Sequence, residues 1–199
     1  MSNMNLEQVA DQYRNRRQDL GRRVILCAGT GCVANGALKI RDRLVETLKS
    51  RNLPVVVELR DERHEPGTTH VSGSGCQGFC QMGPLVTILP DNILFVKVKP
   101  EDVEEIVDET LVNGRPVERL LYRVPATQEV CKGPGEIPFY VRQHRLTLGL
   151  CGAIDPEDIH EYISLRGYEA ARDVYQRWDS ATICEEILAS GLRGRGGGG

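Results

Sequence analysis

Two cysteine pairs constrain this chain more than any other feature. Cys27 and Cys32 enclose four residues, Cys76 and Cys80 enclose three, and 43 residues separate the two pairs. Both pairs sit in segments where strands are expected to end. Glycines lie in and beside them, at positions 29, 31, 75 and 78. Glycine lets backbone approach a compact anion closely and point N–H groups at it. The pattern therefore predicts two loops that fold around a shared centre.

Four thiolates match the needs of a [2Fe-2S] cluster, because two tetrahedral irons bridged by two sulfides leave two external positions each. Three other interpretations of the same cysteines remain open. A structural zinc site also takes four thiolates, although zinc ribbons favour C-x2-C turns. Two disulfides would suit an oxidising compartment. A thiol-disulfide oxidoreductase would normally place C-x-x-C at the start of a helix, where the helix dipole lowers the thiol pKa.

The composition and the charge pattern indicate the compartment and exclude some classes of partner. Seven cysteines occur in a chain whose segment 1–20 is polar and charged and has no apolar stretch of the secretory kind. We therefore expect a cytoplasmic protein with cysteines available for metal or redox chemistry. No run of about 18 apolar residues is present, so no membrane span is expected. The formal charge of -3, with acidic and basic residues interspersed, makes nucleic acid an improbable partner.

The hydrophobic periodicity of the first 120 residues predicts an α/β domain. An amphipathic helix is expected within segment 1–21, and the order that follows is strand, helix, strand, β-hairpin and helix. The predicted elements are strand 23–27, helix 36–49, strand 54–59, loop 61–69, hairpin strands 85–89 and 93–98, and a helix from Pro100 to Asn113. This is the order of a thioredoxin-like domain, which we place at residues 22–120.

The rest of the chain has a different character. Segment 121–150 includes a stretch rich in proline and glycine and is expected to be a linker or extended arm. Segment 151–199 is expected to be helical and to end in a glycine-rich tail. The predicted helices are one capped by Asp155 and ending at Gly167, one over 168–177, and one capped by Ser180 with Ile183, Ile187 and Leu188 facing inward. Cys131, Cys151 and Cys184 are expected to be ordinary buried or exposed thiols.

Two stretches resemble known families. Cys-Ala-Gly-Thr-Gly-Cys at 27–32, with Gly-Cys-Gln-Gly-Phe-Cys-Gln-Met-Gly-Pro at 75–84, is similar to the thioredoxin-like [2Fe-2S] ferredoxins. That resemblance implies one iron held by Cys27 and Cys32 and the other by Cys76 and Cys80. It also implies transfer of single electrons.

The second half resembles the start of the NADH-binding flavoprotein subunit of respiratory complex I. It is more similar to the soluble relatives in NAD-linked, often electron-bifurcating, hydrogenases and formate dehydrogenases. The matching residues are Ile-Pro-Phe-Tyr at 137–140, Cys-Gly-Ala-Ile-Asp-Pro at 151–156, Gly-Tyr-Glu-Ala at 167–170 and Gly-Leu-Arg-Gly-Arg-Gly-Gly at 191–197.

This second resemblance implies an NADH-dependent oxidoreductase subunit that exchanges hydride between NAD(H) and FMN. FMN would be bound by a loop that includes Gly194, Arg195, Gly196 and Gly197. The implied partners are a second thioredoxin-like ferredoxin subunit and an iron–sulfur subunit of hydrogenase or dehydrogenase type. The rest of the flavin domain and the ligands of a [4Fe-4S] cluster are not in the sequence, so we expect a truncated subunit that is inactive alone.

Overall fold

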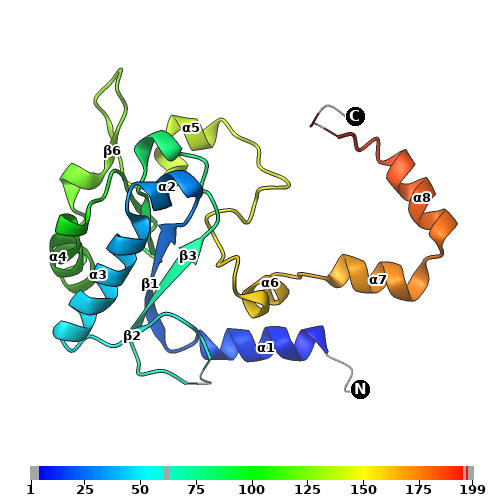
Figure 1. Cartoon of the computed structure of the whole chain (residues 1–199), viewed down its shortest axis with the longest axis horizontal. Helices are drawn as coiled ribbons and strands as arrows, with labels where there is room; N and C mark the ends of the chain where they lie inside the picture. Colours follow the sequence, from blue (N-terminus) through cyan, green and yellow to red (C-terminus); the bar gives the residue numbers. More distant parts are fainter. Residues whose placement is uncertain (1–4, 61–62, 195, 197–199) are drawn as a thin grey trace.

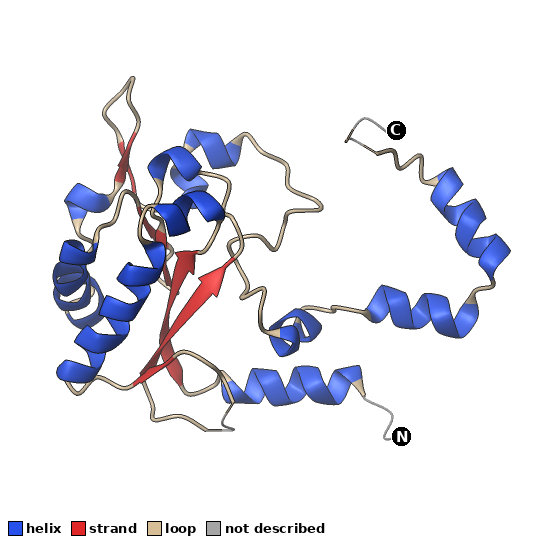
Figure 2. Cartoon of the chain, in the orientation of Figure 1, coloured by secondary structure: helices blue, strands red, loops and turns tan. Residues whose placement is uncertain are grey.

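A mixed β-sheet organises the first part of the molecule (Figures 1 and 2). The computed structural model describes residues 5–60, 63–194 and 196. The five strands are ordered β2-β3-β1-β4-β5, with β1 parallel to β3 and antiparallel to β4. Their bounds are β1 Leu20–Cys27, β2 Val55–Val56, β3 Thr68–Ser74, β4 Val86–Leu89 and β5 Ile93–Phe95. The fold is therefore the thioredoxin-like α/β arrangement that the sequence predicts.

The two central strands determine where the cysteine loops lie. Strands β1 and β3 run parallel, and their register pairs Cys27 with Ser74. Because the carboxyl ends of parallel neighbours share one edge of a sheet, the loops that follow them begin side by side. Cys27 is the last residue of β1, and Cys76 comes two residues after the end of β3.

One face of the sheet packs against apolar helices. Helix α3 (Ala37–Ser50) places Ile40, Leu44 and Leu48 against this face, as its three- and four-residue spacing predicts. The closing helix begins as a 3-10 turn at Pro100–Asp102, continues as α4 (Val103–Glu105) and ends as a π-helix over Ile106–Val112. The main core therefore lies between these helices and alternate residues of β1, β3 and β4.

The opposite face has a polar centre. Helix α1 (Leu6–Arg16), capped by the Asn5 side chain, packs against α6 (Ile159–Ser164) beside this face. Arg23 of β1 forms a bidentate ion pair with Glu161 of α6, with Nη2 2.9 Å from Oε2, and both side chains are almost fully buried. Arg23 also donates to Ser72 of β3 at 2.9 Å. A buried charge requires such a partner, so α6 is tied to the strands that lead to the cysteine loops.

The remaining elements extend from the sheet domain. They are α2 (Thr30–Ala34), 3-10 turns at Cys80–Met82, Glu118–Leu120 and Pro134–Glu136, the hairpin β6 (Tyr122–Arg123) with β7 (Val130–Cys131), α5 (Pro138–Val141), α7 (Glu169–Arg177) and α8 (Ser180–Ala189). In the described part of the chain, no helix has both the length and the apolar character that a membrane crossing requires.

Several predicted elements differ from the observed ones. The 61–69 loop prediction is wrong at its end, because β3 begins at Thr68 and lies between β2 and β1 in the sheet. The strand predicted over 54–59 is reduced to Val55–Val56 at the sheet edge. Helix α6 begins after Asp158, whose carboxylate accepts from the His160 and Glu161 N–H groups, instead of after Asp155.

The last predicted helix also differs in its environment. Asp179, one residue before Ser180, is the N-cap of α8 and accepts from the Thr182 N–H. Ile187 and Leu188 are 56% and 80% exposed, so the prediction that they face inward is wrong. A periodic apolar pattern predicts a helix, but it does not supply the surface that would cover it. The domain boundaries at 21, 120 and 150 stay predictions.

Candidate metal centre

The two cysteines of the first loop are buried. Cys27 and Cys32 are each 1% exposed, and Cys32 lies within the short helix α2. The Cys27 N–H donates to the Leu85 carbonyl at 3.1 Å, and the Ala28 N–H donates to the Ser74 carbonyl at 2.9 Å. These bonds continue the sheet pairing beyond β1, so the first cysteine has a fixed position.

The second cysteine loop faces solvent. Cys76 and Cys80 are exposed, and their sulfurs lie 3.6 Å apart. The Gly78 N–H points at the Cys76 sulfur, 3.4 Å away. Gly78 has a φ of +84°, a left-handed conformation that favours glycine. The loop thus orients a backbone donor toward a thiolate position, as an anionic sulfur requires.

Glycines bring the two loops into contact. A Cβ added at Gly29 would lie 2.9 Å from the Cys76 Cβ, and one added at Gly31 would lie 3.8 Å from the Cys80 Cβ. A Cβ at Gly83, just after the second loop, would lie 2.6 Å from the Cys32 sulfur. Two of these distances are shorter than real Cβ contacts allow. The close approach of the cysteine loops therefore depends on residues without side chains.

The electrostatics of the thiols reflect their proximity. Burial, followed by the neighbouring Cys27 thiol, raises the pKa of Cys32 to about 12. The Cys76 thiol raises the pKa of Cys80. Two neighbouring thiols do not both ionise readily without positive charge beside them. Such a set of donors is suited to a cationic metal centre, at which thiolate ligands lose their protons.

The number of sulfurs that meet at one point separates two kinds of centre. A structural zinc ion needs four ligands around one point, whereas a two-iron cluster needs two thiolates at each of two irons. The cysteines are arranged as two pairs, which suits a two-iron cluster. The sulfurs of Cys76 and Cys80 are adjacent, and the thiols of Cys27 and Cys32 interact.

An aromatic arm lies over the second loop. The Phe79 ring stacks on Phe139 with centroids 4.7 Å apart and meets the edges of Tyr122 and Tyr140 at 5.3 and 5.5 Å. Arg145 donates to the Gln77 carbonyl at 2.9 Å. Sequence reasoning missed these residues and Gly83 as parts of the site. The aromatic Phe139-Tyr140 pair in a segment expected to be a linker was the available indication.

The other three cysteines differ in their environments. Cys131 belongs to the same buried group as Cys27 and Cys32, and its thiol donates to the Glu136 carbonyl at 3.4 Å. Cys151 is half-buried, and Cys184 is exposed on α8. That these three cysteines are ordinary thiols stays a prediction.

The glycine-rich end gives little structural information. Gly194 and Gly196 are exposed, and Arg195 and Gly197 lie outside the described residues. The predicted FMN loop is thus described only in part.

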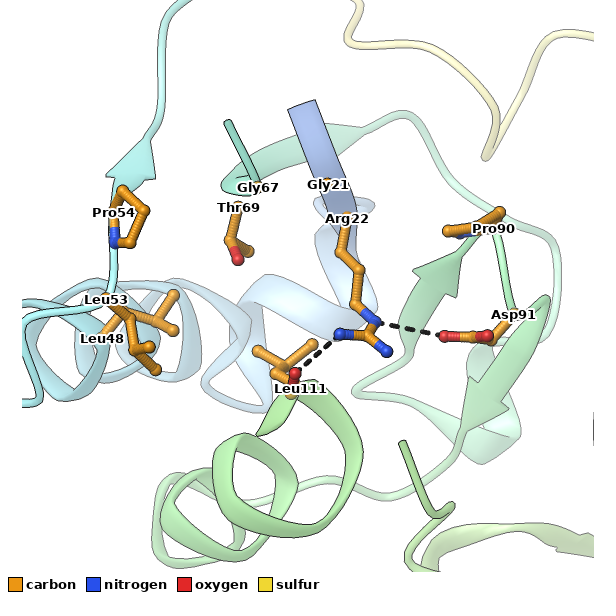
Figure 3. Close-up of a pocket in the computed structure, with 10 residues that line it drawn as sticks. All are labelled: Gly21, Arg22, Leu48, Leu53, Pro54, Gly67, Thr69, Pro90, Asp91 and Leu111. Carbon is orange, nitrogen blue, oxygen red and sulfur yellow. Dashed lines mark hydrogen bonds and ion pairs between the residues drawn. The ribbon is translucent and has the colours of Figure 1, made fainter. Parts of the chain in front are cut away.

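A separate pocket lies at the opposite end of β1 from the cysteines. It has a volume of about 260 Å³ and is lined by residues that include Gly21, Arg22 and Asp91 (Figure 3). The Arg22 guanidinium donates to the Leu111 carbonyl at 2.7 Å and to Asp91 at 3.3 Å. The Arg22 charge is therefore already paired within the protein. The pocket is better explained as part of the packing between helix and sheet.

Comparisons with known proteins identify the family. Residues 1–111 match the thioredoxin-like [2Fe-2S] ferredoxin family. A 2Fe-2S ferredoxin of Aquifex aeolicus (strain VF5) is 50% identical over 54 residues, which are 27% of this chain and 49% of that protein. The NADP-reducing hydrogenase subunit HndC of Solidesulfovibrio fructosivorans is 47% identical over 58 residues, 29% of this chain and 12% of that subunit.

A solved structure of a thioredoxin-like [2Fe-2S] ferredoxin from Aquifex aeolicus aligns with 59% of this chain and 99% of its own, at 28% identity and a TM-score of 0.43. The chain therefore spans about half the length of the Aquifex relative found by sequence and about an eighth of the hydrogenase subunit.

Fold, cysteine loops and sequence match define the class: an electron-transfer domain of the iron–sulfur type. The chain belongs to the thioredoxin-like [2Fe-2S] ferredoxin family, and the family implies one [2Fe-2S] cluster.

Proposed function

We propose that Cys27, Cys32, Cys76 and Cys80 bind the [2Fe-2S] cluster, one pair to each iron, and that the chain transfers single electrons through it. The convergence of the two cysteine loops at Gly29, Gly31 and Gly83 is the observation on which this proposal depends. When bound, such a cluster accepts and releases one electron at a time. The buried pair would exclude water from one side, and the exposed pair would lie where a partner can approach.

The test is anaerobic purification of the chain followed by metal and sulfide analysis. We expect a red-brown protein with about two irons and about two sulfides per chain, and an EPR signal after reduction. A zinc module would be colourless with one metal per four thiolates, and a thiol-disulfide enzyme would reduce disulfides without metal. Either result would overturn the proposal.

We further propose that the chain is part of an NAD(H)-dependent flavoprotein oxidoreductase subunit in a multi-subunit complex. The resemblance of residues 137–197 to flavoprotein subunits supports this role, as does the partial match to a hydrogenase subunit. FMN would bind at the glycines from Gly194 to Gly197, since only glycine backbone approaches a phosphate so closely. A [4Fe-4S] centre, a second thioredoxin-like subunit and a hydrogenase- or dehydrogenase-type subunit would be found outside this chain.

This context needs its own experiment. An affinity tag at the natural gene should allow purification of the natural complex with FMN, further iron–sulfur subunits and NADH-dependent reduction of an artificial acceptor. A preparation that contained the [2Fe-2S] cluster but neither flavin nor partner subunits would refute the flavoprotein context and leave the cluster assignment intact.

A further inference from the structure

The Tyr140 hydroxyl is buried without a hydrogen-bond partner among the described residues. Tyr140 lies outside the main core. Its ring packs against the second group of buried residues, which includes Cys27, Cys32 and Phe79. A buried hydroxyl without a partner costs free energy, so such groups in native proteins call for an explanation.

The surroundings of the hydroxyl indicate what it faces. Burial raises the pKa of Tyr140 to about 12, while the Arg145 charge opposes that rise. The Tyr140 side chain packs against the buried group that includes Cys27 and Cys32. Its ring also meets Phe79, which lies between Cys76 and Cys80. The side chain is therefore next to residues of both cysteine loops, and a phenol stays protonated at neutral pH and can donate.

The ring is held in place from several sides. Phe79, between the two cysteines of the second loop, meets the Tyr140 ring edge at 5.5 Å, and Phe139 meets it at 5.4 Å. The Arg145 guanidinium carbon lies 5.0 Å from the ring centroid, and the same side chain donates to the Gln77 carbonyl. Arg145 thus fastens the arm to the second loop and positions the tyrosine.

We propose that the Tyr140 hydroxyl donates a hydrogen bond to a sulfur of the [2Fe-2S] centre, either a bridging sulfide or a ligand thiolate, and raises its reduction potential. The inference rests on the proposed cysteine ligands. A donor to sulfur stabilises the more negative, reduced state more than the oxidised state, so the equilibrium shifts toward reduction. The arm that follows the ferredoxin domain would then adjust the potential of the centre.

Tyr140→Phe removes only the hydroxyl and is the direct test. We expect unchanged iron, sulfide and visible absorbance, and a fall of about three- to tenfold in the ratio of reduced to oxidised protein at a fixed potential. A tenfold change is about 59 mV for a one-electron couple. Tyr13→Phe is the matched control, because the Tyr13 hydroxyl is also buried without a partner among the described residues but lies on α1, which packs against α6. Its potential should equal that of the unmodified chain.

A second variant keeps the test decisive if Tyr140→Phe fails to assemble. 3-Fluorotyrosine at position 140 keeps the ring and is a stronger donor, so it should raise the potential where Tyr140→Phe lowers it. A structural role of the ring would not produce opposite signs. Potentials unchanged in the fluorinated chain, or in an intact Tyr140→Phe, would overturn the inference while the cluster assignment stands. A colourless unmodified chain would instead overturn the proposed function and this inference with it.

Discussion

The two cysteine loops have similar sequences and opposite environments. Cys27 and Cys32 are buried at the end of β1 and in α2, whereas Cys76 and Cys80 are exposed in the loop that follows β3. The parallel pairing of β1 with β3 places both loops at one sheet edge, but only the cysteines of the first loop are buried in the packing around Leu85 and Ile137. We infer that the first loop fixes and shields the centre, and the second presents it to partners.

The largest expected contrast is in cluster retention. Cys27→Ser should abolish the visible absorbance and the bound iron, because the buried sheet end has no freedom to adjust to a shorter ligand bond. Cys76→Ser should perturb the spectrum strongly but retain more iron, since an exposed loop can move. Anaerobic reconstitution followed by iron analysis and visible spectroscopy measures both.

Cys184→Ser is the matched control for both variants. Cys184 is exposed on α8, away from the loops, and its replacement should leave the spectrum unchanged. If all three variants behaved alike, the ligand assignment would be wrong. If Cys76→Ser lost iron as completely as Cys27→Ser, the proposed difference between the loops would be wrong.

The loops also show what sequence can and cannot predict. The spacing of the four cysteines and their glycines predicted that two loops would converge, and the order of elements predicted the fold class. Strand β3 was missed because its residues, Thr68 to Ser74, alternate poorly and include polar side chains buried in the sheet. The exposure of one pair and the burial of the other depend on packing from distant segments, which spacing does not record.

The arm was missed for a similar reason. A segment rich in proline and glycine predicts an irregular path, and irregular paths still pack when they contain aromatic residues. Ile137 is fully buried and Phe139 stacks on Phe79 across 60 residues of sequence. Contacts of such long range have no local pattern in the chain.

The next largest expected difference between the two cysteine pairs is in the rate of thiol modification in the metal-free chain. With a pKa of about 12, only about one Cys32 thiol in ten thousand is ionised at pH 8, and it is also buried. We expect iodoacetamide to modify Cys76 at least about a hundredfold faster than Cys32. Because pH stays below its pKa, the Cys32 rate should rise about tenfold per pH unit between 7 and 9. Peptide mass spectrometry measures both rates, and equal rates would contradict the buried environment of the first loop.

The buried ion pair between Arg23 and Glu161 should affect the stability of the fold and leave the visible spectrum of the cluster unchanged. Glu161→Gln leaves the buried Arg23 guanidinium without its counter-charge and should lower the free energy of unfolding by about 3 kcal/mol or more. Burial opposes ionisation of Glu161, but hydrogen bonds from Arg23 and the Asp155 N–H outweigh it and hold the Glu161 pKa below its usual range. Its contribution is therefore present above the unfolded pKa and is lost as pH falls through the folded one.

Urea denaturation at neutral and acidic pH measures this effect, and the variant should lose part of the acid sensitivity. Glu109→Gln is the control, since the Arg115–Glu109 pair is exposed and should contribute less than about 1 kcal/mol. An unchanged denaturation midpoint for Glu161→Gln would show that α6 does not depend on this pair. It would also mean that the ion pair does not stabilise the two strands, β1 and β3, that lead to the cysteine loops.

The smallest effect tests the backbone of the second loop. Gly78→Ala forces a Cβ into the left-handed conformation at φ +84° and should cost about 1 kcal/mol of stability. The nearest atom to that Cβ is the Arg145 Nη2 at 2.9 Å, the end of a flexible side chain that can move aside. Gly75→Ala is the control in the same loop, because a Cβ there meets nothing within 4 Å and no left-handed angle is involved. Equal denaturation midpoints for the two variants would mean that the second loop adopts its shape without help from glycine. That outcome would contradict the role of the Gly78 backbone in orienting a donor toward the Cys76 sulfur.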